Sequence, residues 1–188
     1  GMKDKELAAF RNQKLGFVFQ SFHLINSLNV LDNVELPLLY RKVSAKERRH
    51  LAEEVLKKVG LSHRMRHMPT QLSGGQCQRV AIARAIVLQP KYLFCDEPNS
   101  GLDPKTSLVI DQLLHGITHE YGITTIINTH DMNSVMGIGD SILYIYQGHK
   151  EWEGTKNDVF TATNERLNNF IFASDLLRKV KDEGLKQR

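Results

Sequence analysis

The sequence has no long hydrophobic run, and no segment approaches the roughly 20 uninterrupted apolar residues that a membrane-spanning helix needs. It shows no secretory leader either, and Gly1 ahead of Met2 resembles a processing scar. Cysteine is scarce, with two residues in 188, Cys77 and Cys95. So few thiols exclude a disulfide-stapled scaffold and favour reduced, partly buried side chains. Together these absences predict a cytosolic protein.

An excess of charge of one sign is also missing. The chain has 25 Lys and Arg against 21 Asp and Glu, a formal net charge of +4, and the charges are interspersed. Such a balance is better explained by a solvated surface than by nucleic-acid binding, so no nucleic-acid partner is expected. With 41% hydrophobic residues the composition is that of an ordinary globular domain with a substantial core.

No Gly-x-x-x-x-Gly-Lys-Ser/Thr loop, which would cradle nucleotide phosphates, occurs in the chain. The stretch QLSGGQCQRVAIARAI nevertheless begins like a phosphate-binding turn. Ser73 offers a hydroxyl, Gly74 and Gly75 let a ligand approach the backbone, and the helix that follows favours an anion at its start. A simple serine cap with a flexible turn is the alternative, but it leaves Gln76 and Arg79 on the first turn without a role.

Strands and helices alternate along the chain. Apolar, β-branched and aromatic runs predict buried strands at 14–20, 91–97 and 124–130. Capping signals and apolar stripes predict helices at 44–60 and 73–88, and a third that begins near Asp103. A strand, turn and strand near an edge are expected at 141–155, and an amphipathic helical tail at 164–188. The pattern predicts an α/β domain with a largely parallel sheet.

Polar side chains follow the predicted strands at their carboxyl ends, where ligands gather in parallel sheets. Gln20, the pair Asp96 and Glu97, and His130 each hold such a place. An aspartate there can hold Mg²⁺ through water, and a glutamate can orient or deprotonate an attacking water. A histidine can contact a terminal phosphate or hold the glutamate. Taken singly, each residue is better explained as a cap or a structural side chain. The functional prediction therefore depends on these residues occurring together.

In chain order, Gln20 and the motifs LSGGQ, YLFCDEP, SGLD and NTHD resemble the ATPase domains of ABC transporters, over about 14–152. The resemblance implies a P-loop NTPase-like α/β core and the cofactors ATP and Mg²⁺. The implied roles are catalysis by Glu97 and His130 and metal binding by Gln20 and Asp96. The implied contacts to ATP come from Ser73, Gly74, Gly75, Gln76 and Asp103.

The same resemblance implies how the protein assembles. In that family two ATPase subunits pair head to tail, and the LSGGQ turn of one covers the nucleotide held by the other. Transmembrane permease subunits are the further partners, which would place the chain at the cytoplasmic face of the inner membrane. The implied division is an ATPase domain over 1–163, with the helical subdomain and signature helix at about 21–88, and a helical tail over 164–188.

The chain departs from the family pattern because the phosphate loop is missing ahead of Gln20. We expect a shortened chain rather than a degenerate relative, since the downstream elements are intact, and little ATP hydrolysis by this chain alone. The first half resembles lipoprotein-releasing and macrolide-export ATPases, whereas the second half resembles those of phospholipid trafficking with MCE-type partners. Lipid or lipoprotein transport is therefore expected. The alternatives are a non-hydrolytic module that completes a partner's site, and a soluble ABC-type ATPase outside transport.

Overall fold

The computed structural model describes residues 10–11 and 13–172, so the end of the predicted helical tail lies outside the described residues. The chain forms two compact units, Gly1–His130 and Asp131–Arg188. The domain boundary expected at residue 163 falls inside the second unit and stays a prediction.

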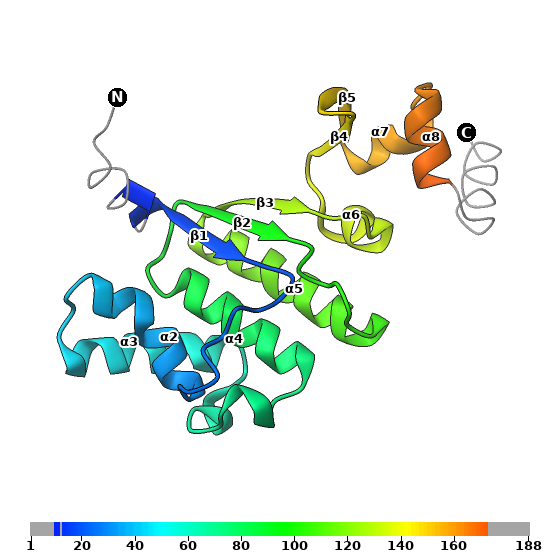
Figure 1. Ribbon diagram of the computed structural model, residues 1–188. Helices are drawn as coiled ribbons and strands as arrows, with labels where there is room; N and C mark the ends of the chain where they lie inside the picture. Colours follow the sequence, from blue (N-terminus) through cyan, green and yellow to red (C-terminus); the bar gives the residue numbers. More distant parts are fainter. Residues whose placement is uncertain (1–9, 12, 173–188) are drawn as a thin grey trace. The chain divides into compact units, whose positions relative to one another are not determined.

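A three-stranded parallel sheet forms the centre of the first unit. Its strands are β1 (Leu15–Val18), β2 (Tyr92–Asp96) and β3 (Thr124–Asn128), in the order β1-β2-β3. Helices α4 (Gly74–Ile86) and α5 (Pro104–Tyr121) lie along one face of this sheet (Figure 1). Gly16 permits the close approach of β1 to α4, because a Cβ there would meet the carbonyl oxygen of Ala85 at 2.7 Å. The predicted α/β fold with parallel strands is confirmed.

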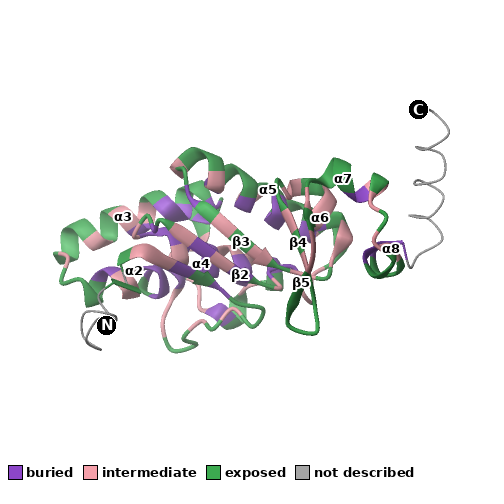
Figure 2. Cartoon of the chain, turned by 90° about the horizontal axis from the view of Figure 1, so that it is seen from above, coloured by how far each residue is buried: buried purple, intermediate pink, exposed green. Residues whose placement is uncertain are grey.

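The other face of the sheet is largely exposed among the described residues of the first unit, which corrects the prediction that these strands are buried. Phe17, Phe94 and Ile126 lie opposite one another across the three strands, and Phe17 and Ile126 are 42% and 50% exposed. Figure 2 shows the strands of this sheet in a mixture of the buried, intermediate and exposed colours. Val18 and Leu93, which point towards the helices, are fully buried. The prediction was wrong because the apolar runs indicate two covered faces, whereas the helices of this unit cover one.

A helical layer packs beside α4 in the first unit. It comprises α2 (Val30–Tyr40), α3 (Ala45–Lys58) and two short 3₁₀ turns, Ser62–Arg64 and Pro69–Gln71. The predicted helix at 44–60 is confirmed: the Ser44 side chain caps it, and Gly60 follows it with a φ of 71°. Apolar side chains of α2, α3, α4 and α5 share one core with β1 and β2. That core holds the sheet and the signature helix as one body.

The second unit is built around a hairpin of β4 (Ile142–Tyr146) and β5 (His149–Gly154), which confirms the predicted strand, turn and strand. Short helices α6 (Met132–Ile138), α7 (Lys156–Thr161) and α8 (Glu165–Ile171) accompany it. Val159, Leu167, Ile171 and Phe172 form a small core, and Met132 and Met136 pack against it. In the part of the chain that the structure describes, none of the helices is long and apolar enough to cross a bilayer.

Candidate functional site

Glu97 and His130 meet at the carboxyl ends of neighbouring strands. Glu97 follows β2 and His130 follows β3 by two residues, so the parallel register brings them to the same edge of the sheet. The Glu97 Oε1 lies 2.8 Å from His130 Nδ1 and accepts a hydrogen bond from the His130 backbone N–H at 3.1 Å. The Glu97 side chain is 22% exposed, whereas that of His130 is 76% exposed. The imidazole therefore reaches into solvent while the carboxylate stays sheltered beneath it.

Glu97 also has an unusual backbone conformation. Its φ is 46°, in the left-handed region, and its N–H donates to the carbonyl of Asn128 at 2.9 Å. That bond continues the β2–β3 ladder one residue past the strand and fixes where the carboxylate begins. Thr129 adds a hydroxyl hydrogen bond to Glu97 Oε2 at 3.3 Å. Both carboxylate oxygens are thus oriented by the segment that follows β3.

Asp96 and Gln20 lie at the same sheet edge, and each has a partner on another loop. Asp96 Oδ1 accepts a hydrogen bond from the Asn128 side chain at 2.8 Å. Gln20 donates through Nε2 to the hydroxyl of Ser100 at 2.8 Å, which leaves its carbonyl oxygen as the atom suited to a metal. The residues expected to bind metal are therefore tied to the neighbouring strand and to the SGLD loop, Ser100–Asp103.

The signature turn, Leu72–Gln76, opens α4. The Ser73 hydroxyl accepts from the Gln76 N–H at 3.3 Å, and the Gln76 side-chain oxygen accepts from the Ser73 N–H at 2.9 Å. This reciprocal capping box is the arrangement that satisfies two helix-start donors at once. Ser73 and Gly74 are exposed. The helix start therefore faces solvent with its serine hydroxyl accessible, as a phosphate contact requires.

Gly75 is required by packing rather than by backbone freedom. A Cβ at this position would lie 2.3 Å from Cγ2 of Thr106 on α5, whereas a Cβ at Gly74 would meet Leu102 at 3.2 Å and Phe22 at 3.8 Å. The glycine lets the start of α4 lie against the start of α5. The signature turn and the SGLD loop consequently stand side by side in one chain.

Asp103 ends the SGLD loop and caps α5. Its carboxylate accepts hydrogen bonds from both the backbone N–H and the hydroxyl of Thr106. These bonds, the side-chain one foremost, lower the pKa of Asp103 below its usual value. The residue is therefore an anion over the physiological pH range, and its implied contact to ATP would be through a partner donor or a bound water.

A buried glutamine and a half-buried arginine connect α4 to the loops of the site, and neither contact was predicted. The fully buried Gln78 donates to the carbonyl of Pro98, next to Glu97, at 2.7 Å. Arg84 donates to the carbonyls of Phe22 and His23, just after Gln20, at 2.8 and 2.6 Å. Burial lowers the pKa of Arg84. A polar residue at an apolar position of a helical stripe was the signal for Gln78; nothing in the pattern distinguished Arg84 from a surface arginine.

The two thiols have no part in the site. Cys77 lies on α4 and Cys95 in β2, and both are buried. Burial raises the pKa of both, that of Cys95 to about 12. They are protonated packing side chains at neutral pH, as the sequence favoured.

The sheet edge thus gathers a carboxylate–imidazole pair, a second carboxylate and an amide, and the first unit also presents an exposed helix start. Among the predicted residues, Glu97 with His130 are in direct contact, while Gln20 reaches the SGLD loop. This set can hold a divalent cation through oxygen atoms and orient a water for attack on a phosphorus centre. Which side chain performs which step remains a prediction for all nine residues.

Comparison with known proteins supports this interpretation. A family model described as "ABC transporter" matches residues 2–100. The chain is 54% identical, over 129 residues, to the uncharacterized ABC transporter ATP-binding protein YknY of Bacillus subtilis, with 69% of this chain and 56% of that protein covered. It is 48% identical over 130 residues to the lipoprotein-releasing system ATP-binding protein LolD of Myxococcus xanthus, with 69% and 58% covered. The chain thus spans little more than half the length of these relatives.

Solved structures match the fold. A dimeric structure of the ABC transporter cassette MJ0796 superposes with a TM-score of 0.73 at 44% identity, covering 82% of this chain and 68% of that one. Another structure of MJ0796 is a post-hydrolysis state bound to ADP and Pi. CbiO1 of Clostridium perfringens, part of the complex cbiONQ, matches with a TM-score of 0.78 at 32% identity over 91% of this chain and 68% of that one. By sequence and by fold, this chain belongs to the ABC transporter family and has the α/β core of its ATP-binding cassettes.

Proposed function

We propose that this chain is the signature-bearing part of an ABC transporter ATP-binding subunit that couples ATP binding and hydrolysis to transport. The observation that carries the proposal is the contact between Glu97 and His130 beside Asp96, at the carboxyl edge of the parallel sheet. A carboxylate that is hydrogen-bonded to an imidazole and lies next to a second carboxylate suits phosphoryl transfer to water.

The residues present fit Mg²⁺ and ATP. Mg²⁺ prefers oxygen ligands, and Asp96 and Gln20 supply a carboxylate and an amide oxygen from one edge of the sheet. When bound, the ion neutralises charge that develops on the phosphate oxygens. Ser73 and the amides that follow it present a hydroxyl and N–H donors at a helix start, which suits a terminal phosphate.

Glu97 orients the attacking water and accepts its proton in this mechanism. Its two oxygens are held from one side by His130 and Thr129, so that the carboxylate has one orientation when water arrives. His130 both fixes that orientation and, with an exposed ring, can donate towards a phosphate oxygen. Asp103 and the signature turn act on the ATP of a paired subunit, as in a head-to-tail dimer.

The transported molecule is proposed to be a lipid or a lipoprotein. The support is the likeness to LolD, whose printed name is a lipoprotein-releasing system ATP-binding protein, together with the motifs of the second half that resemble phospholipid-trafficking ATPases. On this proposal the subunit lies on the cytoplasmic face of the inner membrane against permease subunits.

The decisive experiment restores a phosphate loop. We would join the loop-bearing segment of YknY ahead of Lys14 and measure Mg²⁺-dependent ATP hydrolysis. The hybrid should turn over ATP, and Glu97→Gln should lower kcat by about 100-fold or more while leaving ATP binding in place. The buried-thiol substitution Cys95→Ala serves as the matched control that leaves kcat within about twofold. A hybrid that folds and binds ATP without hydrolysing it would contradict the proposal.

The exposed Ser73 at the start of α4 would also suit one alternative, a module that only completes a partner's site. It is tested by mixing this chain with MJ0796 whose own signature serine has been replaced. Restored hydrolysis that Ser73→Arg abolishes supports a working signature turn. If the two proteins co-elute and hydrolysis stays at the background rate, the turn does not act in trans.

A further inference from the structure

Helix α5 carries two histidines whose ring nitrogens face one another away from the site described above. His115 and His119 lie four residues apart, so they share one face of the helix. Their Nε2 atoms are 3.1 Å apart, the ring centroids are 4.3 Å apart, and both residues are exposed. At this distance one ring N–H donates a hydrogen bond to the nitrogen of the other ring, and a metal ion that displaced this proton would meet two nitrogen ligands open to water.

The distance between the nitrogens matches the separation of two ligands on one metal ion. Zinc binds imidazole nitrogen at about 2.0–2.1 Å, so two nitrogens 3.1 Å apart would subtend about 100° at the ion, near the tetrahedral value of about 109°. Cu²⁺ and Ni²⁺ also accept imidazole pairs at angles of this kind. We propose that His115 and His119 form a divalent-metal site on α5 for a borderline cation such as Zn²⁺, Ni²⁺ or Cu²⁺.

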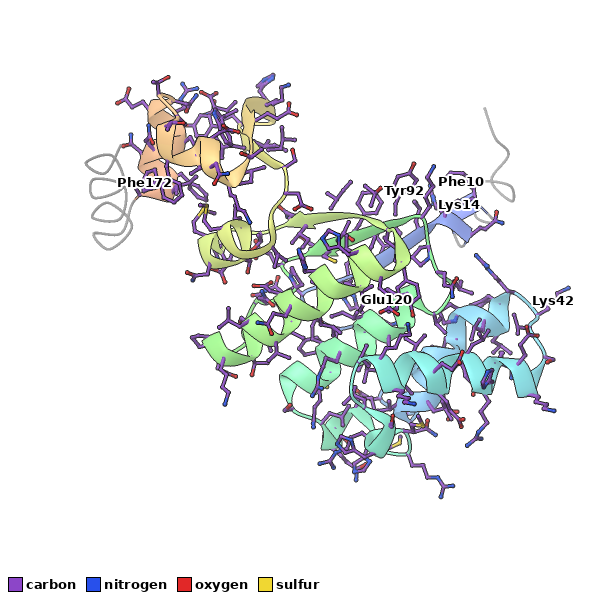
Figure 3. The ribbon with its side chains drawn as sticks, turned by 180° about the vertical axis from the view of Figure 1, so that it is seen from behind. Phe10, Lys14, Lys42, Tyr92, Glu120 and Phe172 are labelled. Atoms are coloured by element: carbon purple, nitrogen blue, oxygen red, sulfur yellow. The ribbon has the colours of Figure 1, made fainter. Side chains whose placement is uncertain are left out.

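The helix supports such a site because its ends are fixed. Asp103 caps its start, and Gly122, with a φ of 60°, ends it. Glu120 lies in the last turn of α5 and is labelled in Figure 3. Its carboxylate forms an ion pair with the ammonium group of Lys58. The histidines can therefore receive an ion without first ordering the backbone.

Another histidine pair in the chain shows why spacing alone is insufficient. His63 and His67 are also four apart, but His63 lies within the 3₁₀ turn Ser62–Arg64 and His67 follows it, and His67 Nε2 lies 2.8 Å from the guanidinium of Arg64. A fixed cation at that distance repels a metal ion. Among the described residues no group of three or more His, Cys, Asp or Glu side chains could hold a metal, so waters would complete the coordination of the α5 ion.

Titration of the tag-free full chain with Ni²⁺ and with Zn²⁺, followed by calorimetry, tests the site. His115→Gln and His119→Gln should each weaken binding by about tenfold or more, because the second nitrogen acts intramolecularly once the first is bound. The control is His50→Gln, an exposed histidine paired at i,i+4 with Glu54, which should change the affinity by less than twofold.

Paramagnetic Cu²⁺ gives a second readout that does not depend on affinity. It should broaden the imidazole NMR signals of His115 and His119 at substoichiometric metal, ahead of those of His63 and His67. Equal broadening of all the histidines, or unchanged affinity in both α5 variants, would overturn the proposal. Because the measurement needs neither ATP nor Mg²⁺, its failure would leave the proposed ATPase role untouched.

Discussion

At the scale of single residues, Glu97 combines the proposed chemistry with a strained backbone. A residue with a side chain pays about 1–2 kcal/mol for a left-handed conformation, and Glu97 adopts it at a φ of 46°. Its carboxylate in turn is held by His130 and Thr129. The strain and the hydrogen bonds can be separated, because the two contributions respond differently to glycine and alanine.

The free energy of unfolding of Glu97→Gly, measured by urea denaturation, should therefore exceed that of Glu97→Ala by about 1 kcal/mol. Both variants lose the same side-chain hydrogen bonds, so their difference reports the backbone. On the exposed middle of α5 the order should reverse: Gln112→Gly should be less stable than Gln112→Ala by about 1 kcal/mol. Equal stabilities at position 97 would show that the loop relaxes and stores no strain.

At the scale of elements, the contact between α4 and α5 depends on the absence of a side chain at Gly75. Alanine normally stabilises a helix relative to glycine by about 1 kcal/mol. At Gly75 the new Cβ would meet Thr106 at 2.3 Å, and the threonine cannot easily turn away because its hydroxyl is bonded to Asp103.

Gly75→Ala should consequently lower the free energy of unfolding by about 1–3 kcal/mol. Gly74→Ala, whose Cβ has a milder contact with Leu102, is the matched control and should stay within about 1 kcal/mol of the parent. Thermal and urea unfolding of both variants measure the difference. Equal stability of the two would mean that α4 and α5 move apart at little cost.

The cap of α5 makes stability depend on acid. The pKa of Asp103 is lowered in the folded chain, so the ionised carboxylate stabilises the fold. This contribution is complete well above the ordinary aspartate pKa of 3.8 and is lost as the pH falls below it through the folded-state pKa. Asp103→Asn keeps a capping oxygen without that titration, so its unfolding free energy should fall less steeply than that of the parent between about pH 5 and pH 3. Parallel curves would contradict the assignment.

We expect the chain to self-associate through the exposed face of its parallel sheet. Its uncovered face presents Phe17 and Ile126, both substantially exposed, and β3 lies at an edge of the sheet. Exposed apolar patches and strand edges are common sites of aggregation.

Phe17→Thr with Ile126→Thr should reduce association in sedimentation velocity, and it should lower the unfolding free energy by about 1–3 kcal/mol because Phe17 stacks on Phe19 and Phe94. Val18→Thr, on the buried face of the same strand, is the control and should cost about 1–3 kcal/mol because its hydroxyl is buried. Unchanged association of the double variant would show that the chains associate through another surface.

At the scale of the whole molecule, the sequence contains signature, carboxylate and histidine elements but no phosphate loop. Without the loop's amides and lysine, ATP loses its main phosphate donors. We expect the 188-residue chain alone to bind ATP weakly and to hydrolyse it at a rate indistinguishable from its Glu97→Gln variant, measured by phosphate release. Robust turnover that disappears in Glu97→Gln would contradict this.

Local patterns predicted much of this molecule. The caps at Ser44, Ser73 and Asp103 could be predicted because capping depends on neighbours in sequence, and the parallel direction of the strands followed from the alternation of strands and helices. The bare sheet face was missed because an apolar strand does not reveal how many layers cover it. The anchoring role of Arg84 was missed because its acceptors lie about 60 positions away, in a loop whose course no local pattern encodes.

The capping box at the signature turn has a consequence for how the reaction would begin. Ser73 and Gln76 already satisfy one another's backbone N–H groups. A phosphate oxygen that binds the Gln76 N–H would therefore replace the Ser73 hydroxyl oxygen as its acceptor. Docking at that N–H would then exchange one hydrogen bond for another, and the Ser73 hydroxyl could accept from the N–H again once the phosphate leaves.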